Sequence, residues 1–505
     1  MGLEDVTCAG RERMSAIGRP TWLLAALAAL AEVPFAEWPL SPDEGGFLLV
    51  ASQWHPGPSL YGHYWVDRPP VLVTLFDLAD HLGGATGLRL IGTGVVVSSV
   101  LLTSVLTGLV ARRRALTPTL VAAIFISTPL FGTEVDGELL SVPFVLLGMV
   151  CLARACRAAP LAAAWAACAG IAGMAAALVK QNVVDVFVVA AVLLGVTAAS
   201  SGSRRALVLA AGVAAGATGF LDLALAMAEI RGTEPSMLWD ALVVFRAHAA
   251  SVIQASATSS TSNRMVTLLV AAVLSGGPLV VVVLVLGLRG PVRVASATGE
   301  VVTDRLVPDL RLPALAVLAW ELTAVAGGGS YWLHYLVGLV PGMVLLAVAA
   351  AQRGTRLRRS TGSAVAFALT SCLTALVVVA SAAPPNAADL AVASYLRSHG
   401  SPGDSVVVGF GHPNIVYESG LHSPYEQLWS LPVRVRDSSL SELTRVLRGR
   451  RAPTWVVVSG PSLATWGVDA TTAQRVLDAD YRRATSVGPY VVWHRTTAAS
   501  QVPGR

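Results

Sequence analysis

The stretch from residue 41 to residue 72 contains the densest group of chemically capable side chains in the sequence. It carries two adjacent carboxylates, two tyrosines, and an aspartate and an arginine before two prolines: Asp43, Glu44, Tyr61, Tyr64 and Asp67-Arg68-Pro69-Pro70. A carboxylate can take the proton of an attacking hydroxyl group, and an arginine can grip a phosphate through two parallel hydrogen bonds. In the alternative interpretation, Asp43 and Glu44 only cap a helix, which leaves residues 61–70 unexplained.

Two other segments place polar side chains at the ends of apolar runs. Lys180-Gln181 follows one such run, and Lys180 is the only lysine among the 36 basic residues. An ammonium group there suits a phosphate headgroup, although a lysine that merely reaches toward the membrane surface is an equal alternative. His334 and Tyr335 follow a glycine-rich turn. A histidine packed at the membrane interface is the alternative to one that faces a reaction cavity.

The composition indicates that membrane helices position these residues. The 505 residues are 54% hydrophobic and only 13% charged, and the mean hydropathy is +0.64, whereas soluble domains are about 25% charged. Apolar runs at 90–110, 268–288 and 364–382 match the roughly 17–25 residues that a membrane helix needs. A soluble enzyme, a nucleic-acid-binding protein and a disordered chain are excluded, and the five cysteines form no disulfide framework or CxxC metal motif.

The apolar runs predict a polytopic α-helical membrane protein with about 11 transmembrane helices, at roughly 20–38, 87–110, 116–132, 138–155, 160–179, 183–200, 206–229, 265–288, 312–327, 331–350 and 362–382. Arginines cluster after every second helix, at 112–114, 154–157, 204–205, 289–293 and 353–359. Positively charged loops stay in the cytoplasm. The sequence therefore predicts a cytoplasmic N-terminus, an extracytoplasmic C-terminus, and two long outer loops at 39–86 and 231–263.

The character of the sequence changes after Ala382, where Pro384-Pro385-Asn386 ends the last apolar run. Helical patterns at 387–399, 439–450 and 471–480 alternate with Val-rich strands at 406–410, 455–459 and 490–493. Such alternation predicts a small α/β domain with a largely parallel sheet. The expected division is a cytoplasmic tail at 1–19, a transmembrane catalytic module at 20–382, and an extracytoplasmic accessory domain at 383–505.

The first outer loop resembles that of the GT-C membrane glycosyltransferases. An Asp-Glu pair just beyond the first helix, then a tyrosine and a basic-Pro-Pro motif, is similar to the protein O-mannosyltransferases and the lipid A aminoarabinose transferases, of the glycosyltransferase family 39 type. The resemblance covers roughly residues 20–350. It implies that Asp43 is the catalytic base with Glu44 beside it, and that Arg68 takes the place of the lysine that holds the lipid phosphate in the aminoarabinose transferases.

The same resemblance extends to the two later segments. Many members have Lys-Gln where this sequence has Lys180-Gln181, which implies that Lys180 also binds the donor phosphate. The segment from Gly327 to Tyr335 is similar to the late aromatic-x-x-His-Tyr segment of the family. The resemblance thus implies a substrate cavity lined by Tyr61, Tyr64, Asp67, Gln181, His334 and Tyr335. In several such enzymes an acidic group of the second outer loop approaches the active site, which here would be Glu134, Asp136 or Glu138, although solvated loop acids are the more ordinary interpretation.

The resulting hypothesis is a multi-pass plasma-membrane glycosyltransferase of a bacterial cell envelope. It transfers a sugar from a polyprenyl-phosphate donor to an acceptor hydroxyl of a protein, lipid or glycan on the extracytoplasmic face, with inversion. A required metal is not favoured, although Asp43, His55 or His63 are possible ligands, and no nucleic acid is expected as a partner. The alternatives are a transporter or flippase of a lipid-linked saccharide and a catalytically silent membrane scaffold. Transporters tend to have repeats and broken helices, and neither is evident.

Overall fold

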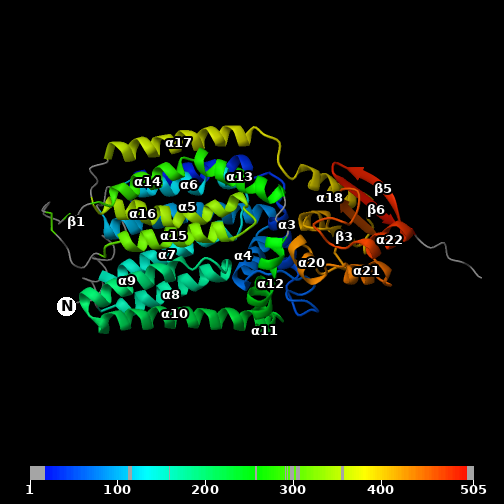
Figure 1. Ribbon diagram of the computed structural model, residues 1–505, viewed down its shortest axis with the longest axis horizontal. Helices are drawn as coiled ribbons and strands as arrows, with labels where there is room; N and C mark the ends of the chain where they lie inside the picture. Colours follow the sequence, from blue (N-terminus) through cyan, green and yellow to red (C-terminus); the bar gives the residue numbers. More distant parts are fainter. Residues whose placement is uncertain are drawn as a thin grey trace, which may run out of the picture. The chain divides into compact units, whose positions relative to one another are not determined.

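The computed structural model describes residues 17–111, 116–157, 160–255, 259–289, 292, 294–295, 301–302, 308–353 and 358–496 (Figure 1). Its chain divides into two compact units. Unit 1 comprises residues 1–36, 89–224 and 258–382, and unit 2 comprises 37–88, 225–257 and 383–505. The expected cytoplasmic tail lies almost wholly outside the described residues, as do the arginines at 112–114, Arg293 and Arg356.

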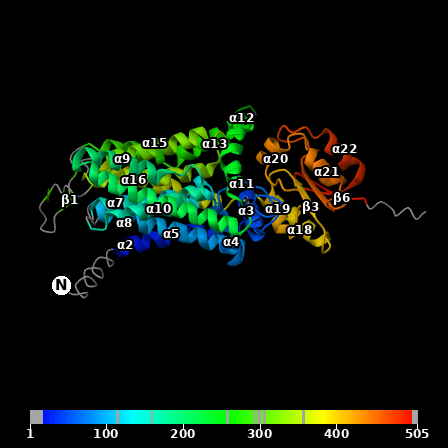
Figure 2. The same ribbon diagram turned by 90° about the horizontal axis from the view of Figure 1, so that it is seen from below.

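Unit 1 is built from helices that run side by side (Figures 1 and 2). In chain order they are α2 (Arg19–Glu32), η1 (Val33–Phe35), α5 (Ala85–Val110), α6 (Thr117–Ile126), η2 (Pro129–Phe131), α7 (Gly137–Arg157), α8 (Ala162–Val179), α9 (Asp185–Ser201), α10 (Ser203–Ile230), α13 (Ser259–Leu274), α14 (Gly277–Gly287), α15 (Arg311–Gly327), η4 (Leu333–Leu339), α16 (Val340–Ala351) and α17 (Arg358–Ala380). The short strands β1 (Val294–Ala295) and β2 (Val301–Val302) pair between α14 and α15.

Helices of both units are membrane-spanning in length and composition. Among the described residues seven helices qualify: Ala85–Val110, Gly137–Arg157, Ala162–Val179, Ser203–Ile230, Pro235–Ala255, Leu333–Ala351 and Arg359–Ala380. The predicted span at 265–288 is broken, because α13 and α14 meet at an angle of 56°. Gly276 at the break has a φ of 73°, a conformation that only glycine adopts without cost.

The other predicted spans are helices that are shorter than the seven named above. They correspond to α2, α6, α9 and α15, with 14, 10, 17 and 17 residues. Prolines explain two of these lengths, since Pro34 follows α2 and Pro129 follows α6, and a helix rarely continues through the residue before a proline. Conversely, the segment 235–255, which the sequence predicts as part of an outer loop, is helical throughout.

Unit 2 combines the first outer loop with segments from much later in the chain. Its helices are α3 (Pro42–Ser52), α4 (Pro70–His81), α11 (Pro235–Trp239), the π-helical turn η3 (Asp240–Val244), α12 (Phe245–Ala255), α18 (Ala387–His399), α19 (Pro413–Ser419), α20 (Ser430–Arg436), α21 (Ser441–Arg448) and α22 (Thr471–Asp480). Helix α3 packs closely against α19: a Cβ atom on Gly45 would lie 2.5 Å from Cα of Asn414. This approach therefore depends on glycine.

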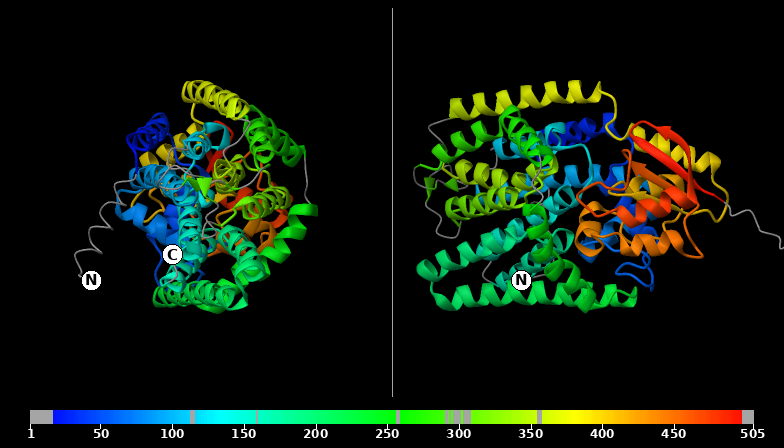
Figure 3. Two further views of the ribbon diagram at one scale, coloured as in Figure 1. Left: turned by 90° about the vertical axis from the view of Figure 1, so that its left-hand side faces the viewer. Right: turned by 45° about the vertical axis from the view of Figure 1, so that its right-hand side comes forward.

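The C-terminal segment forms a four-stranded sheet in the order β3 (Val406–Gly409), β4 (Trp455–Ser459), β6 (Tyr490–Arg495) and β5 (Tyr481–Val487) (Figure 3, orange to red). Helices α18 and α19 lie on one face, and α21 and α22 on the other (Figures 1 and 2). Only β3 and β4 pair in parallel, and the other two pairs are antiparallel. The expected largely parallel sheet is therefore wrong, because β5 returns directly to β6 as a hairpin.

Candidate active site

The residues proposed from the first outer loop lie along α3, with Asp43 and Glu44 in its first turn and Tyr61 beside Trp54, just past its C-terminus. Ser41 caps this helix: its hydroxyl accepts the backbone N–H of Glu44 at 3.2 Å, and the Glu44 carboxylate accepts the backbone N–H of Ser41 at 2.9 Å. This reciprocal capping box buries Glu44, which is 1% exposed. Glu44 therefore has a structural task at the start of the helix, as the capping interpretation expects.

Asp43, by contrast, is half-buried. Its carboxylate accepts a hydrogen bond from a residue far away in the sequence. The indole Nε1 of Trp429 donates to Asp43 Oδ1 at 2.8 Å. Trp429 also lies against Phe47, one turn further along α3, with ring centroids 5.4 Å apart. Arg68 extends its guanidinium over the same Phe47 ring, at 5.6 Å from the centroid. A continuous set of contacts thus connects the Asp43 carboxylate to the Arg68 guanidinium within unit 2.

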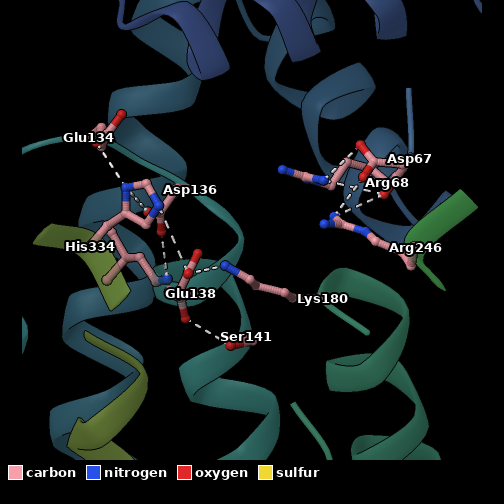
Figure 4. Close-up of polar contacts among 10 residues, drawn as sticks. Asp67, Arg68, Glu134, Asp136, Glu138, Ser141, Lys180, Arg246 and His334 are labelled. Carbon is pink, nitrogen blue, oxygen red and sulfur yellow. Dashed lines mark hydrogen bonds and ion pairs between the residues drawn. The ribbon is translucent and has the colours of Figure 1, made fainter. Parts of the chain in front are cut away.

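Two arginines flank Asp67 (Figure 4). Arg68 Nη1 lies 2.9 Å from Asp67 Oδ1, and Arg246 Nη2, from α12, lies 2.8 Å from Asp67 Oδ2. The Asp67 side chain is 6% exposed, whereas the two arginines are 24% and 34% exposed. The group carries one excess positive charge and presents arginine donors that can bind an anion bidentately. Arg246 is a member of it that the sequence prediction did not include.

Tyr61 and Tyr64 both hold the loop through their hydroxyl groups, and Tyr64 also lines a cavity of about 310 Å³. Tyr61 is fully buried and donates its hydroxyl hydrogen bond to the Arg68 carbonyl at 2.6 Å. The Tyr64 hydroxyl accepts the backbone N–H of Ser423 at 3.0 Å. Burial raises the pKa of both phenols, and the negative charge of Asp67 raises that of Tyr61 further. Both hydroxyls therefore stay protonated, and Tyr61 fixes the backbone from which Arg68 extends.

Unit 1 contains a second polar cluster, formed by His334 and the acids of the second outer loop (Figure 4). His334 Nδ1 lies 3.0 Å from Glu134 Oε1 and 3.3 Å from Asp136 Oδ2, and Nε2 lies 3.9 Å from Glu138 Oε1. Lys180 forms an ion pair with Glu138 and lies 5.0 Å from the centre of the Tyr335 ring. Of the predicted residues in these segments, Lys180, His334 and Tyr335 come together here.

Burial and the neighbouring positive charges act in opposite directions on the pKa of Asp136. Burial raises the pKa of Asp136 to about 6, Glu134 adds to the rise, and the charges of His334 and Lys180 reduce it. Asp136, Glu138 and His334 each offer a ligand atom within 4.8 Å of the others, so these three side chains could hold a metal ion. The cluster differs from the metal ligands considered from the sequence, which were Asp43, His55 and His63.

The remaining predicted residues have simpler surroundings. Gln181 is partly buried next to Lys180. Glu321, an ionisable residue inside α15, is 4% exposed and accepts the backbone N–H of Gly342 at 2.8 Å. It therefore joins α15 to α16.

The sequence prediction missed Trp429 altogether, while the alternation Glu134-x-Asp136-x-Glu138 was a readable signal for the acidic half of the cluster.

No protein-family model matches the sequence, and no curated protein does. The structure is similar to that of ArnT from Cupriavidus metallidurans bound to undecaprenyl phosphate, with a TM-score of 0.58 and 13% identity over 95% of this chain and 99% of ArnT. It is also similar to the Archaeoglobus fulgidus oligosaccharyltransferase in complex with zinc and sulfate, with a TM-score of 0.51 and 14% identity over 94% of this chain and 73% of that one. Both are GT-C glycosyltransferases. The chain therefore is a polytopic membrane protein with the GT-C fold, as the first outer loop predicts.

Proposed function

We propose that the protein is a membrane glycosyltransferase that moves a sugar from a polyprenyl-phosphate donor to an acceptor hydroxyl on the extracytoplasmic face. One observation carries this proposal: Asp43 and Arg68 both adjoin the Phe47 face of α3, Asp43 through Trp429 and Arg68 directly. A carboxylate and an arginine that contact the same aromatic pair, Trp429 and Phe47, can serve as the proton acceptor and the phosphate ligand of one reaction. The GT-C fold and the undecaprenyl phosphate bound to ArnT support this donor class.

In this proposal Asp43 takes the proton of the acceptor hydroxyl through Oδ2, since Oδ1 accepts the bond from Trp429. The hydroxyl oxygen forms a bond to the anomeric carbon of the donor while the bond from that carbon to the phosphate oxygen breaks. The electron pair of that bond leaves with the polyprenyl phosphate. Arg68 stabilises the developing phosphate charge, and a single displacement inverts the anomeric configuration.

The phosphate would meet a guanidinium that already has a partner. A guanidinium has five N–H donors, so Arg68 can keep Asp67 through Nη1 and bind a phosphate oxygen as well. Arg246 adds a second guanidinium at the other side of Asp67. We propose Lys180 as a further cation for the donor, although its ion pair with Glu138 makes its contribution smaller than that of Arg68.

A metal ion is not needed in this proposal. Lys180 already neutralises Glu138, and His334 directs Nδ1 toward the carboxylates of Glu134 and Asp136. A ring nitrogen that donates to a carboxylate has no lone pair for a metal. Lys180 and a protonated His334 offset two of the three carboxylate charges, so in this proposal the cluster is held by the protein's own cations.

Transport of a lipid-linked saccharide is less well supported. Transporters of the broken-helix type place polar groups at the break. The break between α13 and α14 is instead packed against α17: a Cβ atom on Gly276 would meet Phe367 at 2.9 Å and Ala368 at 3.2 Å, and the Ser371 hydroxyl donates to the Leu274 carbonyl. The bend is thus filled by a neighbouring helix.

Replacement of Asp43 by asparagine tests the proposed base. We expect Asp43→Asn to lower kcat by roughly 10²–10⁴-fold and to leave donor binding nearly intact, because the amide keeps the shape but takes no proton. The measurement is sugar transfer by purified protein with a short-chain polyprenyl-phosphate donor. Asp77→Asn is the matched control, since Asp77 pairs with Arg231 in the same unit. A near wild-type rate for Asp43→Asn would remove Asp43 from the chemistry.

Titration with the same donor tests the phosphate ligands. Loss of a hydrogen bond to a charged group costs about 1.5–3 kcal/mol, so Arg68→Ala should weaken donor binding about 10- to 100-fold. Arg68→Lys should recover part of the affinity, because the charge returns without the planar fork. Lys180→Ala should weaken binding less. Arg231→Ala is the control, and unchanged affinity in both Arg68→Ala and Lys180→Ala would contradict the proposed phosphate site.

We also propose that the N-terminus is cytoplasmic and that residues 383–505 are extracytoplasmic in the plasma membrane. The arginine clusters support this orientation, since positive loops remain in the cytoplasm. Alkaline phosphatase fused after Arg505 should be active, because this enzyme folds only outside the cytoplasm, and green fluorescent protein fused there should be dark. A fluorescent fusion together with an inactive phosphatase fusion would show that the C-terminus is cytoplasmic. That result would contradict both the proposed orientation and transfer on the extracytoplasmic face.

Chelation tests the absence of a required metal. We expect transfer activity to persist after dialysis of the purified protein against EDTA, because Lys180 and His334 already pair with the carboxylates of the acidic cluster. The activity of dialysed protein is compared with that of dialysed protein given Mg²⁺, Mn²⁺ or Zn²⁺. Activity that disappears on dialysis and returns with one of these ions would show that the cluster, or another site, holds a required metal.

A further inference from the structure

The proposed base accepts a hydrogen bond from the C-terminal segment. Trp429 and Asp43 are 386 residues apart in the sequence, and the distance from Nε1 to Oδ1 is 2.8 Å. Both residues belong to unit 2. Trp429 directly precedes α20, and its indole is a hydrogen-bond donor only. The contact therefore requires an acceptor at position 43, and the Asp43 carboxylate supplies it.

The same segment fixes the backbone on which Asp43 stands. Asn414 donates through Nδ2 to the carbonyl oxygen of Leu40 at 3.1 Å, directly before the helix cap. Gly46 faces the indole so closely that a Cβ atom there would lie 2.4 Å from the Trp429 ring. Helix α3 thus has no room to shift or rotate against Trp429. The hydrogen bond to Asp43 acts between two groups whose backbones are already held.

Such a bond has a definite effect on a general base. It restrains the side-chain torsions of Asp43, and in the proposed reaction Oδ2 takes the proton. The donor is neutral, so it orients the carboxylate without removing the charge that the base needs. Catalytic geometry is sensitive on this scale, because a misplacement of about 1 Å can reduce a rate by about 10²-fold. Trp429 also packs on Phe47, over which Arg68 lies.

We propose that Trp429 is the positioning residue of Asp43, and that residues 383–505 are consequently a working part of the catalytic centre rather than an attached accessory domain. This inference rests on the proposed function, since it requires Asp43 to act as the base. The motif of the first outer loop does not predict this role of the C-terminal segment.

Trp429→Phe tests the inference, because phenylalanine keeps an aromatic ring against Gly46 and Phe47 but has no N–H donor. We expect kcat to fall about 10- to 100-fold, the range for a lost hydrogen bond to a charged group, with the KM for the donor unchanged. Where the smaller ring disturbs folding, benzothienylalanine introduced at position 429 alone keeps the indole shape without the N–H. The melting temperature and the elution volume in detergent report folding separately.

Tyr417→Phe is the matched control. The Tyr417 hydroxyl, on the same C-terminal segment, bonds to the carboxylate of Asp80 in the first outer loop at 3.2 Å. Its loss removes an equivalent tie between the same segments but touches no group of the proposed chemistry. We expect Tyr417→Phe to keep its kcat. An equal loss of kcat in Tyr417→Phe and Trp429→Phe would mean that general docking, and not the position of Asp43, is responsible, and would overturn the inference.

A double-mutant cycle separates this inference from the proposed function. If Trp429 acts through Asp43, Trp429→Phe has no further effect on the residual rate of Asp43→Asn, because interacting residues are not additive. The same fold-loss in both backgrounds, or full activity of Trp429→Phe, would overturn the positioning role and leave the base in place. Full activity of Asp43→Asn alone would instead overturn the proposed function.

Discussion

The capped N-terminus of α3 is the constraint on which the proposed site depends. Ser41 and Glu44 satisfy each other's backbone groups there, and Gly45 allows α19 to approach to within contact distance. A helix start that is fixed in this way holds its first-turn carboxylate in one place. The position of Asp43, the ring of Phe47 beneath Arg68, and the indole of Trp429 all follow from where this one helix begins.

The sequence was informative wherever the signal is local. Apolar runs predicted most of the long helices, and Val-rich runs predicted β3, β4 and β6. Ser41-x-x-Glu44 also fits the capping-box pattern, so the structural task of Glu44 was readable as the alternative to catalysis. Strand β5 gave no such signal, because arginine and polar residues make it a mostly exposed edge strand.

Contacts between distant segments could not be predicted in this way. Nothing near Trp429 indicates a carboxylate 386 residues earlier, and nothing near Asp67 indicates Arg246 as its second partner. The second polar cluster is an intermediate case. The acids Glu134, Asp136 and Glu138 are visible as an alternating pattern, but buried carboxylates are costly unless they are paired, and their partners His334 and Lys180 come from two other parts of the chain.

Unit 2 is assembled from three stretches of chain, 37–88, 225–257 and 383–505, and this discontinuity orders events during synthesis. The ribosome releases the first stretch long before the last, so α3 emerges without the surface of α19 and without Trp429. Pairing over such sequence distances is slow, because a long loop must close first. For most of its synthesis the nascent protein therefore has Asp43 and Arg68 without the C-terminal residues that pack against them. If Trp429 works as proposed, transfer reaches its full rate only after the C-terminal segment has been made and has packed against α3.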